Sequence, residues 1–142
     1  MKYMIMMFGS QLDYDAIAGR VNEGRPAWSE EDMAALHAFM TKWNNDLVES
    51  GEFVDACGMT APVHARRVGV RDGVPVVTDG PYPESQEVLA GYTIVECASF
   101  DRATEIAARL ADTPAPAGED LGGREWYVDV RPIAGSASEL EL

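Results

Sequence analysis

Residues 78–92 read Thr-Asp-Gly-Pro-Tyr-Pro-Glu-Ser-Gln-Glu-Val-Leu-Ala-Gly-Tyr, and they join two runs of strand-forming residues. A Val-rich run ends at Val77, and an apolar run resumes at Val88. Between them, the side chain of Asp79 can accept hydrogen bonds from the backbone N–H groups of a turn. The Gly that follows tolerates a positive φ, and the Pro after it fixes φ. The stretch therefore predicts two β-strands joined at a stiff corner that carries an acidic side chain.

Other segments have the alternation or the apolar run of a β-strand. Strands are predicted over residues 2–8, 53–57, 63–71, 75–78, 88–98 and 125–133. The segments on either side of Asp72 and Gly73 indicate a β-hairpin, because Asp-Gly favours the two-residue turns that match strand twist. In the strand over 88–98, Tyr92, Ile94 and Glu96 share one face.

Two helices are expected, over residues 29–50 and 100–111. Ser29 and Asp32 resemble a capping box with Asp in place of Glu, and Gly51 is suited to stop the first helix. The apolar stripe of that helix consists of Met33, Leu36, Met40, Trp43 and Leu47.

The order of elements is strand, helix, strand, hairpin, strand, helix, strand. This order indicates an α+β fold, a ferredoxin-like sandwich with an inserted β-hairpin. Residues 1–133 would form a single domain, and residues 134–142 an acidic, frayed tail. Residues 9–28 are expected to be a long loop with a turn of helix, and residues 112–123 a second loop. Since two helices cover only one face of such a sheet, we expect a homodimer with a two-fold axis to cover the other.

The composition argues against several classes of protein. The chain has 142 residues and a formal net charge of −13, which disfavours nucleic acid, because phosphates are neutralised by clustered Lys and Arg. No apolar run approaches the ~20 residues of a transmembrane helix. The short apolar start also lacks the cleavage site of a signal peptide. A cytoplasmic protein that does not bind membranes is expected.

No cofactor and no metal ion are expected from the motifs. His37 and His64 lie far apart, and neither has a His or Cys four residues away. Cys57 and Cys97 lie in apolar runs, so both are expected to be buried, unpaired thiols. The sequence contains neither a Gly-rich phosphate loop nor a nucleophile elbow.

Three stretches carry a family resemblance. They are Tyr-Met-Ile-Met-Met-Phe-Gly at residues 3–9, the segment from Val77 through Thr-Asp-Gly-Pro-Tyr to Tyr92, and Val-Asp-Val-Arg-Pro-Ile at residues 128–133. In order and spacing they resemble the YCII-related family, in its DGPF-type branch, over residues 1–133. The resemblance implies a dimeric α+β barrel with a small-molecule site between the helix and the barrel mouth.

The resemblance also bears on function. A cofactor-free dehydrochlorinase of hydroxylated aromatics belongs to this family, and a His and an Asp are proposed as an acid–base pair in some members. That His follows an Arg-Pro-Ala stretch at the start of the helix. Here Arg25, Pro26 and Ala27 are followed by Trp28, so that His is absent. Some proteins of this branch are similar to partners encoded beside extracytoplasmic-function sigma factors, which implies a regulatory alternative.

Four residues are candidates for catalysis. Asp79 is the candidate general base, since partial desolvation beside aromatic rings would suit it for proton transfer. A carboxylate that only holds the turn is the alternative. Tyr82 and Tyr92 would orient a substrate through their hydroxyls, or else serve in packing. His37, at the edge of the helical stripe, could shuttle protons or lie at the core boundary without a chemical role.

Glu96 and Arg131 are the candidate substrate-binding residues. Glu96 lies among apolar residues, where a buried carboxylate must be paired or neutral. Arg131 or Arg124 could form a cross-strand ion pair with it, or Glu96 and Arg131 could bind a polar substrate group. The basic cluster over 64–71 either binds an anionic ligand or an acidic partner, or blunts a sheet edge.

The sequence leaves two functions open. The first is a cofactor-free acid–base enzyme of lyase, isomerase or dehalogenation type, which acts on a small cyclic or aromatic substrate with Asp79 as base and Arg131 as anion clamp. The second is a non-catalytic small-molecule-binding or regulatory module. A deep cavity lined by Asp79, Tyr92 and Glu96 would favour the enzyme, whereas a filled barrel would favour the module.

Overall fold

Strand β1 (Lys2–Gly9) lies inside the main sheet of the computed structural model, which describes residues 1–20, 22, 25–116 and 125–141. It pairs antiparallel with β5 (Val88–Glu96) on one side and with β6 (Asp129–Pro132) on the other. Strand β2 (Phe53–Gly58) pairs antiparallel with β5, which gives the order β2-β5-β1-β6. This mixed α+β arrangement is compatible with the predicted ferredoxin-like fold.

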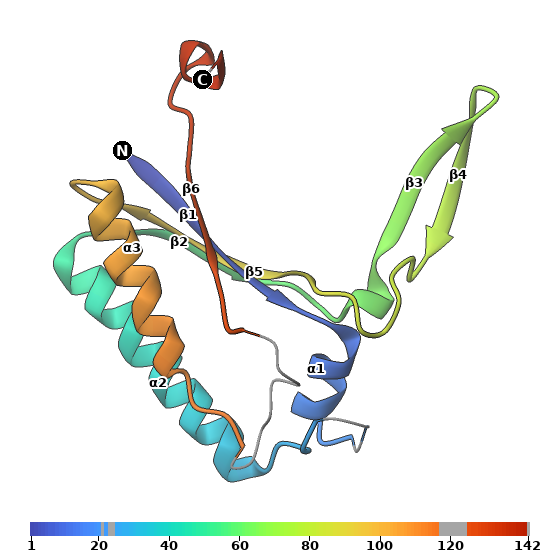
Figure 1. Ribbon diagram of the computed structural model, residues 1–142, viewed down its shortest axis with the longest axis horizontal. Coiled ribbons are helices and arrows are strands. Elements are labelled where there is room, and N and C mark those ends of the chain that lie inside the picture. The colour runs from blue at the N-terminus through green and yellow to red at the C-terminus, as the bar shows by residue number, and fades with distance from the viewer. Residues whose placement is uncertain (21, 23–24, 117–124, 142) are drawn as a thin grey trace.

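Helices α2 (Glu30–Ser50) and α3 (Phe100–Ala108) lie on one face of this sheet (Figure 1). The capping box predicted for α2 is confirmed, because the Asp32 amide donates to the Ser29 hydroxyl and the Ser29 amide donates to the Asp32 carboxylate. Gly51 ends the helix with a φ of 78°, which glycine adopts without strain. No helix in the described ranges is long and apolar enough to span a membrane.

A further helix lies between β1 and α2. The sequence predicted a long loop with a turn of helix there, and the helix α1 (Gln11–Ile17) is longer than predicted, at about two turns. The Asp13 amide donates to the Ser10 hydroxyl, and the Ser10 amide donates to the Asp13 carboxylate. A Ser three residues before an Asp was the available signal for this capping box. The structure also has short 3-10 helices η1 (Pro62–His64), η2 (Arg109–Asp112) and η3 (Ala137–Glu141).

Strands β3 (Arg66–Arg71) and β4 (Val74–Asp79) form a separate two-stranded sheet. Asp72 and Gly73 at its turn have φ values of 51° and 77°, which confirms the predicted Asp-Gly hairpin. Gly80 follows with a φ of 51°, and a Cβ there would lie 3.3 Å from a neighbouring carbonyl oxygen. The corner between the hairpin and β5 therefore favours glycine.

The core lies between the sheet and the two long helices. Its largest members are Tyr3, Ile5, Trp43, Leu47, Ile106 and Leu110, each at most 5% exposed. The indole N–H of Trp43 donates to the Ile106 carbonyl oxygen at 3.3 Å. The bulkiest core side chain therefore ties α2 to α3 and also satisfies its own polar atom.

The opposite face of the sheet, here called the open sheet face, carries the alternate residues of the same strands. Its central side chains are Met4, Met6, Tyr92 and Ile94, all half-buried. Both long helices lie on the other side of the sheet (Figure 1). Association with a second copy through the open sheet face stays a prediction.

The prediction of two buried thiols is wrong for Cys57. Its side chain is exposed, because β2 is an edge strand and Cys57 lies opposite Tyr92 on the open sheet face. Cys97 is half-buried, and both thiols are free.

An ion pair fastens α3 to the corner between α2 and β2. Arg102 donates from Nε and Nη2 to the two carboxylate oxygens of Glu52 at 2.9 and 2.8 Å. The Glu52 side chain is 14% exposed. Hydrogen bonds from Arg102 lower the pKa of the Glu52 carboxyl from 4.5 to about 2, although burial acts to raise it.

We expect Leu47→Ala to lower the free energy of unfolding by about 2–5 kcal/mol, because it leaves a cavity in a closely packed core. Val48→Ala is the matched control, since Val48 is the next residue of the same helix and is 59% exposed. Its effect should stay within about 0.5 kcal/mol. Denaturant unfolding measures both, and equal losses would contradict the assignment of Leu47 to the core.

A carboxylate whose pKa is lowered by folding stabilises the protein above its unfolded pKa and loses that contribution as the pH falls. For Glu52 the loss should run from about pH 4.5 down to about pH 2. Glu52→Gln should therefore flatten the dependence of unfolding free energy on pH in that window, as measured by urea unfolding at a series of pH values. Glu49→Gln, at an exposed position of α2, is the control. The assignment fails if Glu52→Gln and the unsubstituted protein give parallel curves.

Candidate functional site

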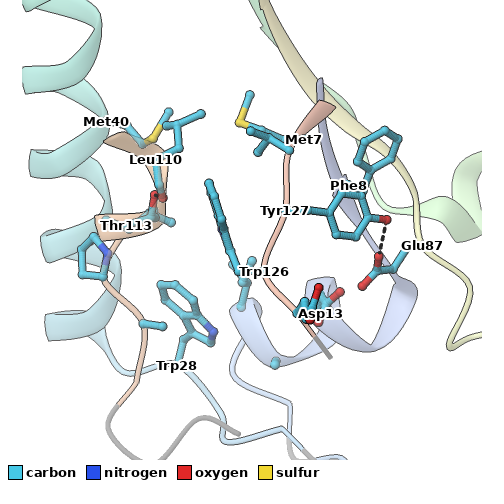
Figure 2. Close-up of a pocket in the computed structure, with 17 residues that line it drawn as sticks. Met7, Phe8, Asp13, Trp28, Met40, Glu87, Leu110, Thr113, Trp126 and Tyr127 are labelled. Carbon is cyan, nitrogen blue, oxygen red and sulfur yellow. Dashed lines mark hydrogen bonds between the residues drawn. The ribbon is translucent and has the colours of Figure 1, made fainter. Parts of the chain in front are cut away.

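A cavity of about 450 Å³, here called the aromatic pocket, opens between α1, α2 and the segment of residues 125–128 that leads into β6 (Figure 2). Leu36 and Met40 of α2 and Leu110 of η2 line its helical side. Such a volume suits a small-molecule ligand.

The end of β1 supplies two successive side chains to this cavity. Met7 and Phe8 both line it, although neighbouring strand residues ordinarily point to opposite faces. The pairing of β1 with β5 shifts register between these two residues. A bulge of this kind re-aims a side chain, and here it brings Phe8 to the pocket.

Aromatic rings form much of the remaining wall. Phe8 stacks on Tyr127 with ring centroids 5.6 Å apart and an interplanar angle of 30°. Trp28, directly before the N-cap of α2, and Trp126 add two indole rings (Figure 2). Flat apolar walls favour a flat ligand that can stack on them.

A carboxylate and a phenol meet at one side of the pocket. The Tyr127 hydroxyl donates to Oε2 of Glu87 at 2.8 Å (Figure 2). Glu87 directly precedes β5, and Tyr127 lies two residues before β6, so the main sheet fixes the backbone of both. The pair places a carboxylate that can take up a proton and a phenol oxygen that can accept a further hydrogen bond beside an apolar cavity, an arrangement suited to acid–base chemistry.

Asp13 and Glu125 also line the pocket, and the role of the Asp13 carboxylate differs from that of Glu87. Burial acts to raise the pKa of Asp13, but hydrogen bonds from the Ser10 amide, the Arg25 guanidinium and the Ser10 hydroxyl outweigh burial and lower it. The Ser10 amide and hydroxyl donate to Asp13 at 2.8 and 3.0 Å. Asp13 is therefore held charged and oriented by the cap of α1, which suits binding or support more than proton transfer.

Two predicted site residues lie on the hairpin corner. Asp79 ends β4, its side chain is 79% exposed, and it pairs with Arg66 at 3.1 Å. The guanidinium carbon of Arg67 lies 5.3 Å from the centroid of the Tyr82 ring, a cation–π contact. The stiff corner is present, but neither residue lines the aromatic pocket.

Tyr92 lies on the open sheet face, beside Cys57 and Asp55 of β2. A hydrogen bond with Cys57, followed by the charges of Cys57 and Asp55, raises the pKa of the Tyr92 phenol. His37 is exposed on α2, where it borders a shallower cavity that also touches Trp28.

Glu96 and Arg131 are exposed, and Glu96 is not the buried carboxylate that its apolar neighbours suggested. Their strand register places both on the open sheet face, on either side of β1. Within the described part of the chain they do not form the predicted ion pair with each other. Arg124, the alternative partner, lies outside the described residues. None of the six predicted site residues lines the aromatic pocket, and their functional roles stay predictions.

The sequence did carry signals for two residues of the pocket. Glu87 lies within the stretch over 78–92, immediately before a strand, where chemistry-bearing side chains are common. Trp28 follows Arg25, Pro26 and Ala27, the position where the resemblance places an acid–base His, and it lines the pocket. No pattern in the sequence identifies Trp126 as a wall of the pocket.

Comparison with known proteins gives two matches. The family model described as YCII-related domain matches residues 1–123. An uncharacterized protein of Rhizobium meliloti (strain 1021) is 27% identical over 108 residues, which span 76% of this chain and 81% of that protein.

Proposed function

The chain belongs to the YCII-related domain family, and we propose that it binds a small, flat, largely apolar molecule in the aromatic pocket and acts on it by cofactor-free acid–base chemistry. One observation carries this proposal. The Glu87 carboxylate, bonded to the Tyr127 hydroxyl, faces a cavity of about 450 Å³ with aromatic walls.

The walls limit the class of ligand. Phe8, Trp28, Trp126 and Tyr127 offer ring faces, while Met40 and other aliphatic side chains close the helical side. A cyclic or aromatic molecule with one or two polar groups would bury its ring against these walls. Its polar group would then lie near Glu87.

The chemistry would divide between two groups. Glu87 would accept a proton from the bound molecule, and the Tyr127 oxygen, whose own proton is donated to Glu87, would orient the ligand by accepting a hydrogen bond from it. Acid–base routes for the elimination of halide, for isomerisation and for lyase reactions begin with such a proton transfer. The alternative is a non-catalytic binding or regulatory module that uses the same pocket without turnover.

The first prediction concerns binding. We expect phenols or halogenated aromatics, such as para-chlorophenol, to raise the melting temperature, because a ligand of the native state stabilises it by mass action. Trp126→Ala should weaken that binding by roughly tenfold, the effect of losing one stacking wall. Phe100→Ala is the matched control, since Phe100 is 45% exposed against 43% for Trp126 and does not line the pocket. Calorimetric titration measures the dissociation constants, and equal effects of the two substitutions would rule out this pocket.

The second prediction concerns turnover of a ligand found in this way. Glu87→Gln keeps the shape of the side chain and can still accept the Tyr127 hydrogen bond, so the dissociation constant should change less than about threefold. Turnover should fall by about 100-fold or more, since the general base is gone. Asp79→Asn is the comparison, because the sequence assigns the base to Asp79. Loss of turnover in Asp79→Asn alone would return the role to that residue. Binding without turnover in the unsubstituted protein would favour the module.

A further inference from the structure

A second cavity lies beside the aromatic pocket, between α2 and the edge strand β2 of the main sheet. It has a volume of about 370 Å³ and is here called the edge cavity. Its floor is the end of the ladder between β2 and β5, where Ala56 lies opposite Thr93 and Gly58 lies opposite Gly91. Small side chains and two facing glycines leave the space below the helix unfilled, which explains why a cavity forms in an otherwise closely packed layer.

The two cavities are neighbours, because Met7 of β1 and Met40 of α2 line both of them. Both side chains lie at the end of the aromatic pocket that is away from Trp28 and Asp13 (Figure 2). Methionine is unbranched, so its side chain changes shape more readily than that of a branched residue. The boundary that the two cavities share is therefore built from side chains that can yield to a ligand.

Helix α2 leads from one cavity to the other. Leu36, Met40 and Asn44 are spaced four residues apart, so they lie on one face of the helix. Leu36 lines the aromatic pocket, Met40 lines both cavities, and Asn44 lines the edge cavity. A ligand that extends along this face of α2 would pass from the aromatic walls to the Asn44 side chain.

Asn44 brings an unsatisfied polar atom to the edge cavity. Its Oδ1 atom is buried and accepts no hydrogen bond within the described part of the chain. Buried polar atoms in folded proteins nearly always have a partner, because an unpaired one has lost its hydration without compensation. An amide oxygen accepts hydrogen bonds and does not donate them. The edge cavity therefore presents an acceptor that the hydroxyl or N–H group of a ligand would satisfy.

Charge distinguishes the two cavities. Asp13, Glu87 and Glu125 line the aromatic pocket, whereas none of the described residues that line the edge cavity has a charged side chain. An ionised group would find no counter-charge in the edge cavity and would be costly to bury there. A neutral hydrogen-bond donor is therefore the group that suits Asn44.

We propose that the aromatic pocket and the edge cavity form one divided binding site, whose ligand is a flat ring with a short aliphatic chain that ends in a hydroxyl. The inference rests on the proposed function and specifies its ligand class. The ring stacks in the aromatic pocket with its reacting group near Glu87, the chain passes Met7 and Met40, and the terminal hydroxyl donates to Oδ1 of Asn44. Met40 and Asn44 are about 6 Å apart along the helix axis, so a chain of roughly four or five atoms spans that distance.

The test pairs two ligands with two proteins. The ligands are para-(ω-hydroxybutyl)phenol and para-pentylphenol, which differ only in a terminal hydroxyl or methyl group. Asn44→Leu replaces the acceptor by an apolar side chain with the same branching, and calorimetric titration measures the four dissociation constants. The preference for the hydroxyl-ended ligand, expressed as the ratio of its dissociation constant to that of para-pentylphenol, should weaken by at least roughly tenfold in Asn44→Leu, because this double cycle isolates one hydrogen bond.

Asn45→Leu is the matched control, because Asn45 is the next residue of α2, is exposed and does not line the edge cavity. Its ratio should stay within about twofold of that of the unsubstituted protein. Equal ratios in all three proteins would overturn the proposal, as would equal changes in the two variants. Nuclear magnetic resonance gives a second readout: the side-chain amide signals of Asn44 should shift with the hydroxybutyl ligand and not with para-chlorophenol, which has no chain.

The outcomes separate this inference from the proposed function. If Trp126→Ala weakens the binding of para-chlorophenol while the two chain-bearing phenols show no dependence on Asn44, the aromatic pocket stands and the divided site is overturned. If binding of the hydroxybutyl ligand depends on Asn44 but not on Trp126, the ligand occupies the edge cavity alone, which also overturns the divided site. Failure of every phenol to bind would overturn both proposals.

Discussion

The packing of α2 and α3 against one face of the sheet is the interaction on which the rest of the structure depends. Trp43 is 1% exposed, and its bond to the Ile106 carbonyl fixes the two helices to each other above the sheet. Toward its N-terminus, α2 continues beyond this contact. Leu36 and Met40 belong to the same apolar stripe as Trp43, but they line the aromatic pocket. The pocket is thus the place where the stripe of one helix extends past the sheet on which it packs.

The position of the pocket at the end of this stripe bears on which parts of the fold could be predicted from the sequence. Helical spacing predicted the stripe, and the Ser29 cap, the Gly51 stop and the Asp-Gly turn predicted element ends, because each acts over a few residues. Spacing shows which side chains share a face, but not whether that face meets a sheet or a cavity. The pocket also gathers side chains from β1, α1, α2 and the residues before β5 and β6. The bulge that brings Phe8 there depends on pairing between strands far apart in the sequence.

The residues around Trp28 show why the chemistry of a site has to be inferred from its own side chains. An indole does not exchange protons near neutral pH, so the position that the resemblance gives to a His supplies only a wall here. Proton transfer then falls to the carboxylates. Asp13 is committed to the Ser10 amide and to Arg25, which keep it charged. Glu87 bonds a phenol at the rim of the apolar cavity, which is the better geometry for a group that must take and return a proton.

The aromatic pocket and the open sheet face, where association with a second copy stays a prediction, lie on different sides of the sheet, yet strand β1 contributes to both. Met4 and Met6 of β1 belong to the open sheet face, whereas Met7 and Phe8 line the pocket. Packing between two copies would hold the backbone of β1 and β5 in place, since a strand cannot shift one face without carrying the other. That would also fix the bulge that aims Phe8 at Tyr127. Self-association would then act on ligand binding by ordering the pocket wall, without adding a residue to it.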